Sequence, residues 1–216
     1  METKTWIEQQ KIIVIVRGTY GDTLLRLADA LHQGGIRLME ITFDQKDPAH
    51  LEKTARAIAE LRRNFGSRML FGAGTVLSTE QVDVAAQAGA AYLISPNTNE
   101  RVIRRSKELG LVSIPGATTP TEILNAHDCG ADFVKLFPAA ALGLTYCKDI
   151  MAPINHVKLI ATAGINEENL SDFLRLGFVG AGVSGRLTDK KLIAEQNWQE
   201  LTRRAEKFTC IASTPA

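Results

Sequence analysis

The sequence predicts a single-domain α/β protein, a TIM (β/α)8 barrel, and two observations carry that prediction. Short runs of β-branched and apolar residues recur at intervals of roughly 20 to 30 residues, about the length of one strand, one helix and two loops. Amphipathic stretches at helical spacing lie between these runs. A doubly wound sheet is the alternative, but it needs fewer strands and a switch in strand order, which eight evenly spaced units disfavour.

The predicted strands and helices follow one another along the whole chain. Strands are predicted at residues 12–16, 38–43, 69–71, 91–94, 111–114, 133–136, 157–160 and 178–182. The clearest helices are predicted at residues 22–34, 48–64, 79–88 and 99–109. Gly34-Gly35 is a typical stop after the first of these helices. Ser78, Thr119 and Asn166 each precede acidic residues, a pattern that opens a helix.

The two ends of the chain give weaker signals. Residues 1–10 contain Trp6 and Ile7, and we expect them to form a short helix that closes the bottom of the barrel. No linker or low-complexity tract interrupts the pattern, so residues 1–216 are interpreted as one domain. The tail from about residue 209 is expected to be disordered, because chain ends fray unless they are tied down.

The composition excludes several classes of partner. The 216 residues carry a net charge of +1 and no basic stripe, so we expect neither nucleic acid nor a membrane surface as a partner. The first apolar run is too short for a signal peptide or a membrane span, which predicts a cytoplasmic protein. The three cysteines and four histidines lack metal-ligand spacing, so we expect no metal and no disulfide framework.

Two charged residues interrupt apolar runs and are the candidates for catalysis. Lys135 lies in the predicted strand Phe133-Val134-Lys135-Leu136, where burial would favour a neutral amine that can attack a carbonyl. The alternative is a lysine that reaches water at the strand end or pairs with a buried carboxylate. Glu40 lies in a similar run and can face the same interior. The two residues could therefore form a buried salt bridge, or an acid–base group beside a Schiff-base lysine.

Glycine-rich loops follow three of the predicted strands, at the end of the barrel where reacting groups collect. The segment Gly180-Ala181-Gly182-Val183-Ser184-Gly185 matches the dinucleotide pattern G-x-G-x-x-G, but no complete βαβ unit follows it. We interpret it as a phosphate cradle, in which backbone N–H groups and the Ser184 hydroxyl approach an anion. The alternative is that these glycines serve only tight turns. Thr75, in Gly72-Ala73-Gly74-Thr75, is a candidate donor to a substrate carboxylate.

The motifs taken together, in this order and spacing, resemble those of the 2-dehydro-3-deoxy-6-phosphogluconate (KDPG) / 4-hydroxy-2-oxoglutarate (KHG) aldolase family. They are Glu40-Ile-Thr, Gly72-Ala-Gly-Thr-Val, Ile94-Ser-Pro-Asn, Ile114-Pro-Gly, Val134-Lys-Leu-Phe-Pro-Ala and Thr162-x-Gly164-Ile165. The resemblance extends from Arg17 to Ser184. It implies a class I aldolase on a TIM barrel, a homotrimer, with no metal and no cofactor.

The resemblance also implies a role for each matching position. Lys135 matches the lysine that forms an imine with the C2 keto group, and Glu40 matches the residue that moves protons. The other matches are substrate-binding: Thr75 near the pyruvate carboxylate, Gly164, Gly182 and Ser184 in the phosphate cradle, Arg17 and Thr162 at strand ends, and Pro96 and Phe137 as pocket walls.

Two positions depart from the family pattern, and the branch of the family stays open. Asp44 stands where many members carry a carboxylate-binding arginine, and Ala163 stands where a second glycine is usual. Arg17-Gly18 and Pro96-Asn97 are similar to the galactonate branch, whereas Thr162 is similar to the gluconate branch.

The expected substrate is a small keto-acid sugar phosphate. The expected reaction is cleavage of 2-dehydro-3-deoxy-6-phosphogluconate to pyruvate and glyceraldehyde 3-phosphate. The 6-phosphogalactonate epimer and 4-hydroxy-2-oxoglutarate are alternative substrates. Two other functions are considered: an epimerase or isomerase with Glu40 as its base and Lys135 acting only through its charge, and a catalytically silent sugar-phosphate binding module.

Overall fold

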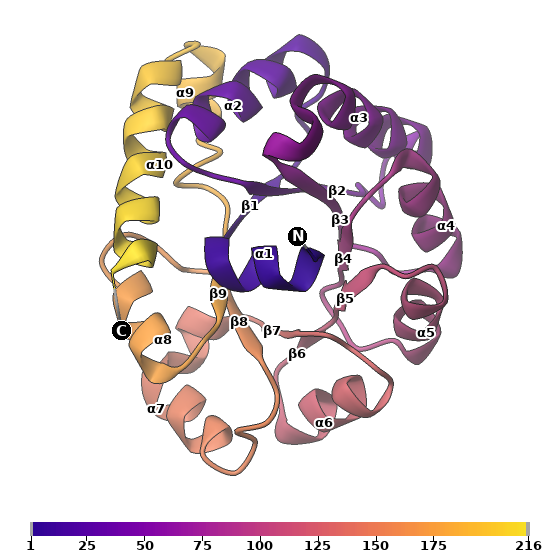
Figure 1. Ribbon diagram of the computed structural model, residues 1–216, viewed down its shortest axis with the longest axis vertical. Helices are drawn as coiled ribbons and strands as arrows, with labels where there is room; N and C mark the ends of the chain where they lie inside the picture. The colour runs from indigo at the N-terminus through magenta and orange to yellow at the C-terminus, as the bar shows by residue number, and fades with distance from the viewer. Residues whose placement is uncertain (1, 215–216) are drawn as a thin grey trace.

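A computed structural model describes residues 2–214 as a barrel of parallel strands surrounded by helices (Figure 1). Its strands within this range are β1 (Ile12–Val16), β2 (Leu38–Thr42), β3 (Leu70–Gly74), β4 (Tyr92–Ile94), β5 (Val112–Ile114), β6 (Gly116–Ala117), β7 (Val134–Leu136), β8 (Leu159–Thr162) and β9 (Gly180–Val183). They are hydrogen-bonded in the order β5-β4-β3-β2-β1-β9-β8-β7-β6. The predicted TIM barrel is confirmed.

The described residues form nine strands, one more than predicted, because the fifth predicted strand is split into β5 and β6. Pro115, which has no N–H to donate, separates β5 from β6. The two pieces form opposite ends of the hydrogen-bonded order, so this short segment brings the barrel round on itself. The Pro115 carbonyl still accepts from Lys135 N at 2.8 Å, which ties the break to β7.

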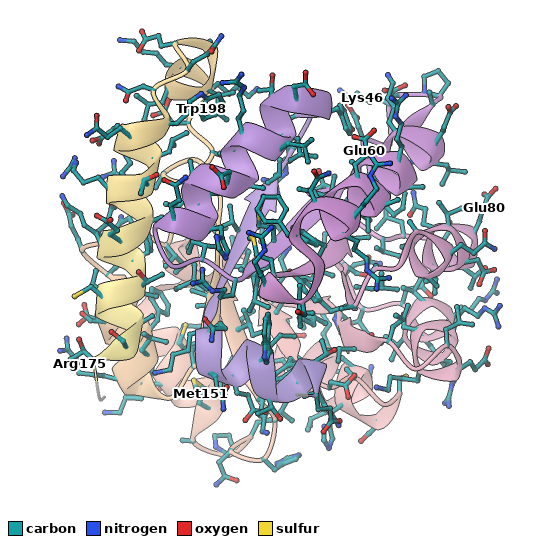
Figure 2. The ribbon with its side chains drawn as sticks, turned by 45° about the horizontal axis from the view of Figure 1, so that its top comes forward. Lys46, Glu60, Glu80, Met151, Arg175 and Trp198 are labelled. Atoms are coloured by element: carbon teal, nitrogen blue, oxygen red, sulfur yellow. The ribbon has the colours of Figure 1, made fainter. Side chains whose placement is uncertain are left out.

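Alternation along each strand separates two apolar regions. Ile13 and Ile15 of β1 face the barrel interior, whereas Val14 and Val16 pack against the surrounding helices. The helices are α2 (Gly21–Gln33), α3 (His50–Phe65), α4 (Thr79–Ala88), α5 (Glu100–Glu108), α6 (Pro120–Asp128), α7 (Ala139–Met151), α8 (Leu170–Leu176), α9 (Lys190–Ala194) and α10 (Trp198–Ser213), with a 3-10 turn η1 (Gly66–Arg68). Figure 2 shows α2 and α10 side by side, with Trp198 at the start of α10.

Helix α1 (Thr3–Gln10) lies across one end of the barrel, as the sequence predicts (Figure 1). Ile7, only 1% exposed, packs with Ile13, Leu38 and Phe133 at the amino ends of the strands. The opposite end of the barrel, where the strands finish, stays free of this helix.

Most helix boundaries agree with the sequence signals. Ser78 caps α4 by accepting from Gln81 N, and Thr119 forms a reciprocal capping box with Glu122. Asn166 is an exception: its side chain accepts from the N–H groups of Glu168 and Asn169, and α8 begins only at Leu170. The signal at Asn166 therefore marks a turn before the helix.

The prediction of a disordered tail from about residue 209 is wrong for the residues up to Ser213. Helix α10 continues to Ser213 because Phe208 and Ala212 are buried and hold its last turns against the barrel. Residues 215 and 216 lie outside the described range. No helix within residues 2–214 has the length and apolar character needed to cross a membrane.

Candidate active site

Two neighbouring cavities lie toward the carboxyl ends of the strands. The wider one, about 380 Å³ and here called the mouth cavity, is lined by six predicted site residues: Arg17, Phe137, Thr162, Gly164, Gly182 and Ser184. The inner cavity, about 10 Å³, lies inside the barrel and is lined by Glu40 and Lys135. Ile15, Thr162 and Gly182 line both cavities, so the two catalytic candidates lie directly below the mouth cavity.

Glu40 reaches this site because strand alternation turns it inward. It pairs in register with Ile15 of β1 and Gly72 of β3, and it is 1% exposed. Among the residues that the structure describes, none bonds its Oε2 atom. Burial raises the pKa of the Glu40 carboxyl from 4.5 to about 7, although the charges of Lys135 and Arg17 act in the opposite direction. A carboxyl with this pKa can take up and release a proton near neutral pH.

Gly74 gives the Glu40 carboxyl its space. A Cβ atom on Gly74 would lie 2.8 Å from both Cδ and Oε1 of Glu40, closer than real Cβ contacts. Any larger residue at Gly74, the last residue of β3, would therefore force the Glu40 carboxyl out of this position.

Lys135 occupies the middle of β7, where its side chain is surrounded by apolar groups. The residue is 6% exposed, and its Nζ lies 4.9 Å from the centre of the Phe137 ring. Desolvation by burial lowers the pKa of the Lys135 amine, Glu40 acts to raise it, and Arg17 lowers it. The salt bridges found within residues 2–214 do not include a Lys135–Glu40 pair. The amine is thus available for a ligand. The buried Lys135–Glu40 salt bridge, one of the two possibilities raised from the sequence, does not form among residues 2–214.

The mouth cavity is shaped by the loops after β8 and β9. Ala163 and Gly164 have consecutive left-handed backbone angles, φ +76° and +75°, and a Cβ on Gly164 would lie 2.5 Å from Ala140 Cβ. Asn169 Nδ2 donates to the Gly164 carbonyl at 2.9 Å and holds the turn. The methyl group at Ala163 therefore stands in a strained conformation that glycine would adopt freely.

Arg17 and Ser184 meet at this mouth from opposite ends of the sequence. Arg17 Nη1 donates to Ser184 Oγ at 3.1 Å, and Ser184 Oγ donates to the Ile15 carbonyl at 3.3 Å. Since β1 and β9 are neighbours, the two predicted substrate-binding positions lie side by side. Together they present a cation and a hydroxyl group to the mouth cavity.

Three other positions lie at the same end of the barrel without lining either cavity. Thr75 follows β3 with φ +56°, and Pro96 follows β4 against the backbone of Gly116. Asp44 is exposed, and its Oδ1 accepts from Lys46 N at 3.1 Å within the loop after β2. The Asp44 carboxylate therefore accepts a hydrogen bond within its own turn and does not line either cavity.

Sequence reasoning missed several polar residues around the site. Arg186 and Asn166 line the mouth cavity, and the only signal for Arg186 was its place directly after the glycine-rich loop. Gln45 Nε2 donates to the Thr75 carbonyl at 3.0 Å, and Gln81 Nε2 donates to Gln45 Oε1 at 3.0 Å. This pair of amides holds the strained backbone of Thr75. Side chains that could hold a metal ion do not gather in groups of three or more within residues 2–214.

Comparison with known proteins points to one family. The family model described as KDPG and KHG aldolase matches residues 3–204. The 2-dehydro-3-deoxy-phosphogluconate aldolase of Haemophilus influenzae is 33% identical over 91% of this chain and 90% of its own length. The 2-dehydro-3-deoxy-6-phosphogalactonate aldolase of Escherichia coli is also 33% identical, over 84% of this chain and 86% of its own.

Solved structures agree with the sequence comparison. A structure described as native KDPGal superposes with a TM-score of 0.82 at 32% identity, covering 93% of each chain. A KDPG aldolase from Legionella pneumophila, with pyruvate captured at low pH as a covalent carbinolamine intermediate, gives a TM-score of 0.84 at 26% identity. It covers 95% of this chain and 97% of its own. With the catalytic candidates inside the same barrel, these matches show that the chain belongs to the KDPG and KHG aldolase family and is an aldolase, that is, a lyase.

Proposed function

We propose that this protein is a class I aldolase that cleaves a 2-keto-3-deoxy-6-phospho sugar acid through an imine on Lys135. One observation carries the proposal: the buried amine of Lys135 and the buried carboxyl of Glu40, which form no salt bridge with each other within residues 2–214, line one small cavity next to the barrel mouth. Low polarity favours the neutral amine, which is the form that attacks a keto group.

The proposed reaction begins when the Lys135 amine attacks the C2 keto carbon of the substrate. Glu40 protonates the hydroxyl group of the resulting carbinolamine, which leaves as water, and the protonated imine that forms withdraws electrons from the C3–C4 bond. Glu40 takes the proton of the C4 hydroxyl, the C3–C4 bond breaks, and its electron pair forms an enamine while the aldehyde leaves. A proton then returns to C3, and water hydrolyses the pyruvyl imine to release pyruvate and the free lysine.

The expected products are pyruvate and glyceraldehyde 3-phosphate, from 2-dehydro-3-deoxy-6-phosphogluconate. The mouth cavity supports a phosphorylated substrate because it combines Arg17, the Ser184 hydroxyl and the glycine turns after β8 and β9. The galactonate epimer is a second candidate. It is supported by Arg17 at the cavity and by the absence of an arginine at position 44, features that the sequence shares with that branch.

A cleavage assay on three substrates tests the proposal. Pyruvate release is followed by its coupled reduction with NADH, using the 6-phosphogluconate and 6-phosphogalactonate keto acids and 4-hydroxy-2-oxoglutarate. We expect turnover of a phosphorylated keto acid that disappears in Lys135→Ala. Pyruvate release that persists in Lys135→Ala would overturn the imine mechanism, and isomerisation without pyruvate release would favour an epimerase or isomerase.

A silent binding module remains distinguishable by thermal unfolding. Ligand-dependent stabilisation without pyruvate release would support that alternative, since a ligand bound by the folded state raises stability even if nothing reacts. The family resemblance further supports a cytoplasmic homotrimer. Light scattering after gel filtration tests the trimer, and a monomer at working concentration would contradict it.

A further inference from the structure

The mouth cavity carries an uneven distribution of charge. Among the described residues, its wall contains two arginines, Arg17 and Arg186, and no aspartate or glutamate. Arg17 comes from the end of β1, whereas Arg186 comes from the turn after β9 that Leu187 N closes onto the Ser184 carbonyl at 2.7 Å. Glu167, outside the wall, pairs with Arg186, so Arg17 supplies the positive charge that no carboxylate within residues 2–214 offsets, and Arg186 supplies N–H donors for an anionic group.

Arg186 is held in place at both ends. Its Nε and Nη2 donate to the two carboxylate oxygens of Glu167 at 2.9 and 3.1 Å, a bidentate contact. Its backbone carbonyl accepts from Arg204 Nη1 at 3.2 Å. The guanidinium still has Nη1 and the second Nη2 hydrogen for another acceptor. A preoriented fork of this kind loses little conformational entropy when it binds a ligand.

The Arg186–Glu167 pair is poorly explained as a device for stability. The Arg186 side chain is 55% exposed, and exposed ion pairs contribute little to folding. Glu167 belongs to the loop between β8 and α8, the same loop that places Gly164 and Asn166 on the cavity wall. Burial acts to raise the pKa of Glu167, but the Arg186 hydrogen bonds prevail and the pKa is lowered, so Glu167 stays charged and keeps the fork oriented.

We propose that Arg186 and Arg17 together bind the terminal phosphate monoester of the substrate, and that Arg186 makes the enzyme prefer phosphorylated keto acids to those ending in a carboxylate. This inference rests on the proposed function. A phosphate monoester carries close to two negative charges and three acceptor oxygens, so it can engage two guanidinium groups and the Ser184 hydroxyl at once. A carboxylate has one charge and two oxygens, and it satisfies only one of the two arginines.

Binding of glycerol 3-phosphate, with glycerate as the carboxylate competitor, tests this role without requiring turnover. Dissociation constants are measured by ³¹P NMR titration for the wild type, for Arg186→Gln, and for the double variant Arg186→Gln with Glu167→Gln. The double variant is needed because Arg186→Gln alone leaves the Glu167 charge unpaired near the site. Arg175→Gln is the matched control: Arg175 is also paired with a carboxylate, that of Asp172, but it lies at the edge of the molecule away from the mouth cavity (Figure 2).

We expect both Arg186 variants to bind glycerol 3-phosphate about tenfold or more weakly, the loss typical of a charge-assisted hydrogen bond, and to lose most of the preference over glycerate. Arg175→Gln should bind as the wild type does. Wild-type affinity in the double variant, an equal loss in Arg175→Gln, or an unchanged preference over glycerate would each overturn the proposal. Trapping of pyruvate on Lys135 reports the proposed function separately, because Arg186→Gln leaves the inner cavity intact.

Discussion

Replacing Glu40 with glutamine should change how the stability of the protein depends on pH. The free energy of unfolding of the variant, measured relative to the wild type, should be higher at high pH than at low pH. Below pH 4.5 the carboxyl is protonated in the folded and the unfolded chain alike, so burying it costs no charge. Above pH 7 the folded chain must bury a carboxylate that has no hydrogen-bond partner on Oε2 within the described residues. The stability that protonated Glu40 contributes is therefore complete at low pH and is lost as the pH rises from about 4.5 to about 7.

The size of the effect follows from the pKa of Glu40, which burial raises from 4.5 to about 7. Each pKa unit corresponds to about 1.4 kcal/mol, so the ionised side chain costs about 3 kcal/mol in the folded state. Glu40→Gln keeps the shape of the side chain and does not titrate. The free energy of unfolding of the variant minus that of the wild type should thus rise by about 3 kcal/mol between pH 4.5 and pH 8.

Urea unfolding followed by circular dichroism measures this difference, at one protein concentration because oligomers unfold in a concentration-dependent way. Glu122→Gln is the control with the opposite sign. Backbone N–H groups of Thr118 and Thr119 lower the pKa of Glu122, so its loss should destabilise the protein most at high pH. A difference for Glu40→Gln that stays flat or falls as the pH rises would refute the argument that burial raises the pKa of Glu40 to near neutral pH.

Three further substitutions test the packing at the site and at the opposite end of the barrel. Gly74→Ala should lower kcat/KM by at least about tenfold while circular dichroism stays unchanged. The new Cβ would lie 2.8 Å from the Glu40 carboxyl and displace it. Unaltered kinetics would show that the Glu40 carboxyl does not depend on the space at Gly74. Ala163→Gly should raise the free energy of unfolding by about 0.5–1 kcal/mol, because relief of the φ +76° strain exceeds the added chain entropy, whereas Ala86→Gly inside α4 should lower it. Ile7→Ala should cost about 2–5 kcal/mol in urea unfolding, as for other buried residues, and a cost below about 1 kcal/mol would show that α1 does not close the barrel.

The fold could be predicted because its signals are local. Each strand appears as an apolar run, and helix starts such as Ser78 and Thr119 use caps within three residues of the bond they make. The split between β5 and β6 needed the hydrogen-bond pattern around Pro115, which composition does not contain. The last turns of α10 are ordered by contacts with distant parts of the chain, and periodicity near residue 209 could not predict them.

Only some residues of the candidate site could be predicted from the sequence. Lys135 and Glu40 stand out because a charge in an apolar run is costly without a reason. Arg186 resembles any surface arginine in the sequence, and its importance appears only with Glu167, 19 residues earlier, and with the cavity that it lines. Thr75 shows the reverse case: the motif marks it as substrate-binding, yet within the described structure its carbonyl is bound by Gln45 and it lines neither cavity.

Reductive trapping on Lys135 tests the central proposal most directly. The protein is incubated with pyruvate and borohydride, and the intact mass and the modified peptide are determined by mass spectrometry. We expect one covalent adduct per chain on Lys135, absent from Lys135→Ala and still formed in Arg186→Gln. An unchanged mass of the wild type, or an adduct that survives Lys135→Ala, would contradict a Schiff-base mechanism at this residue.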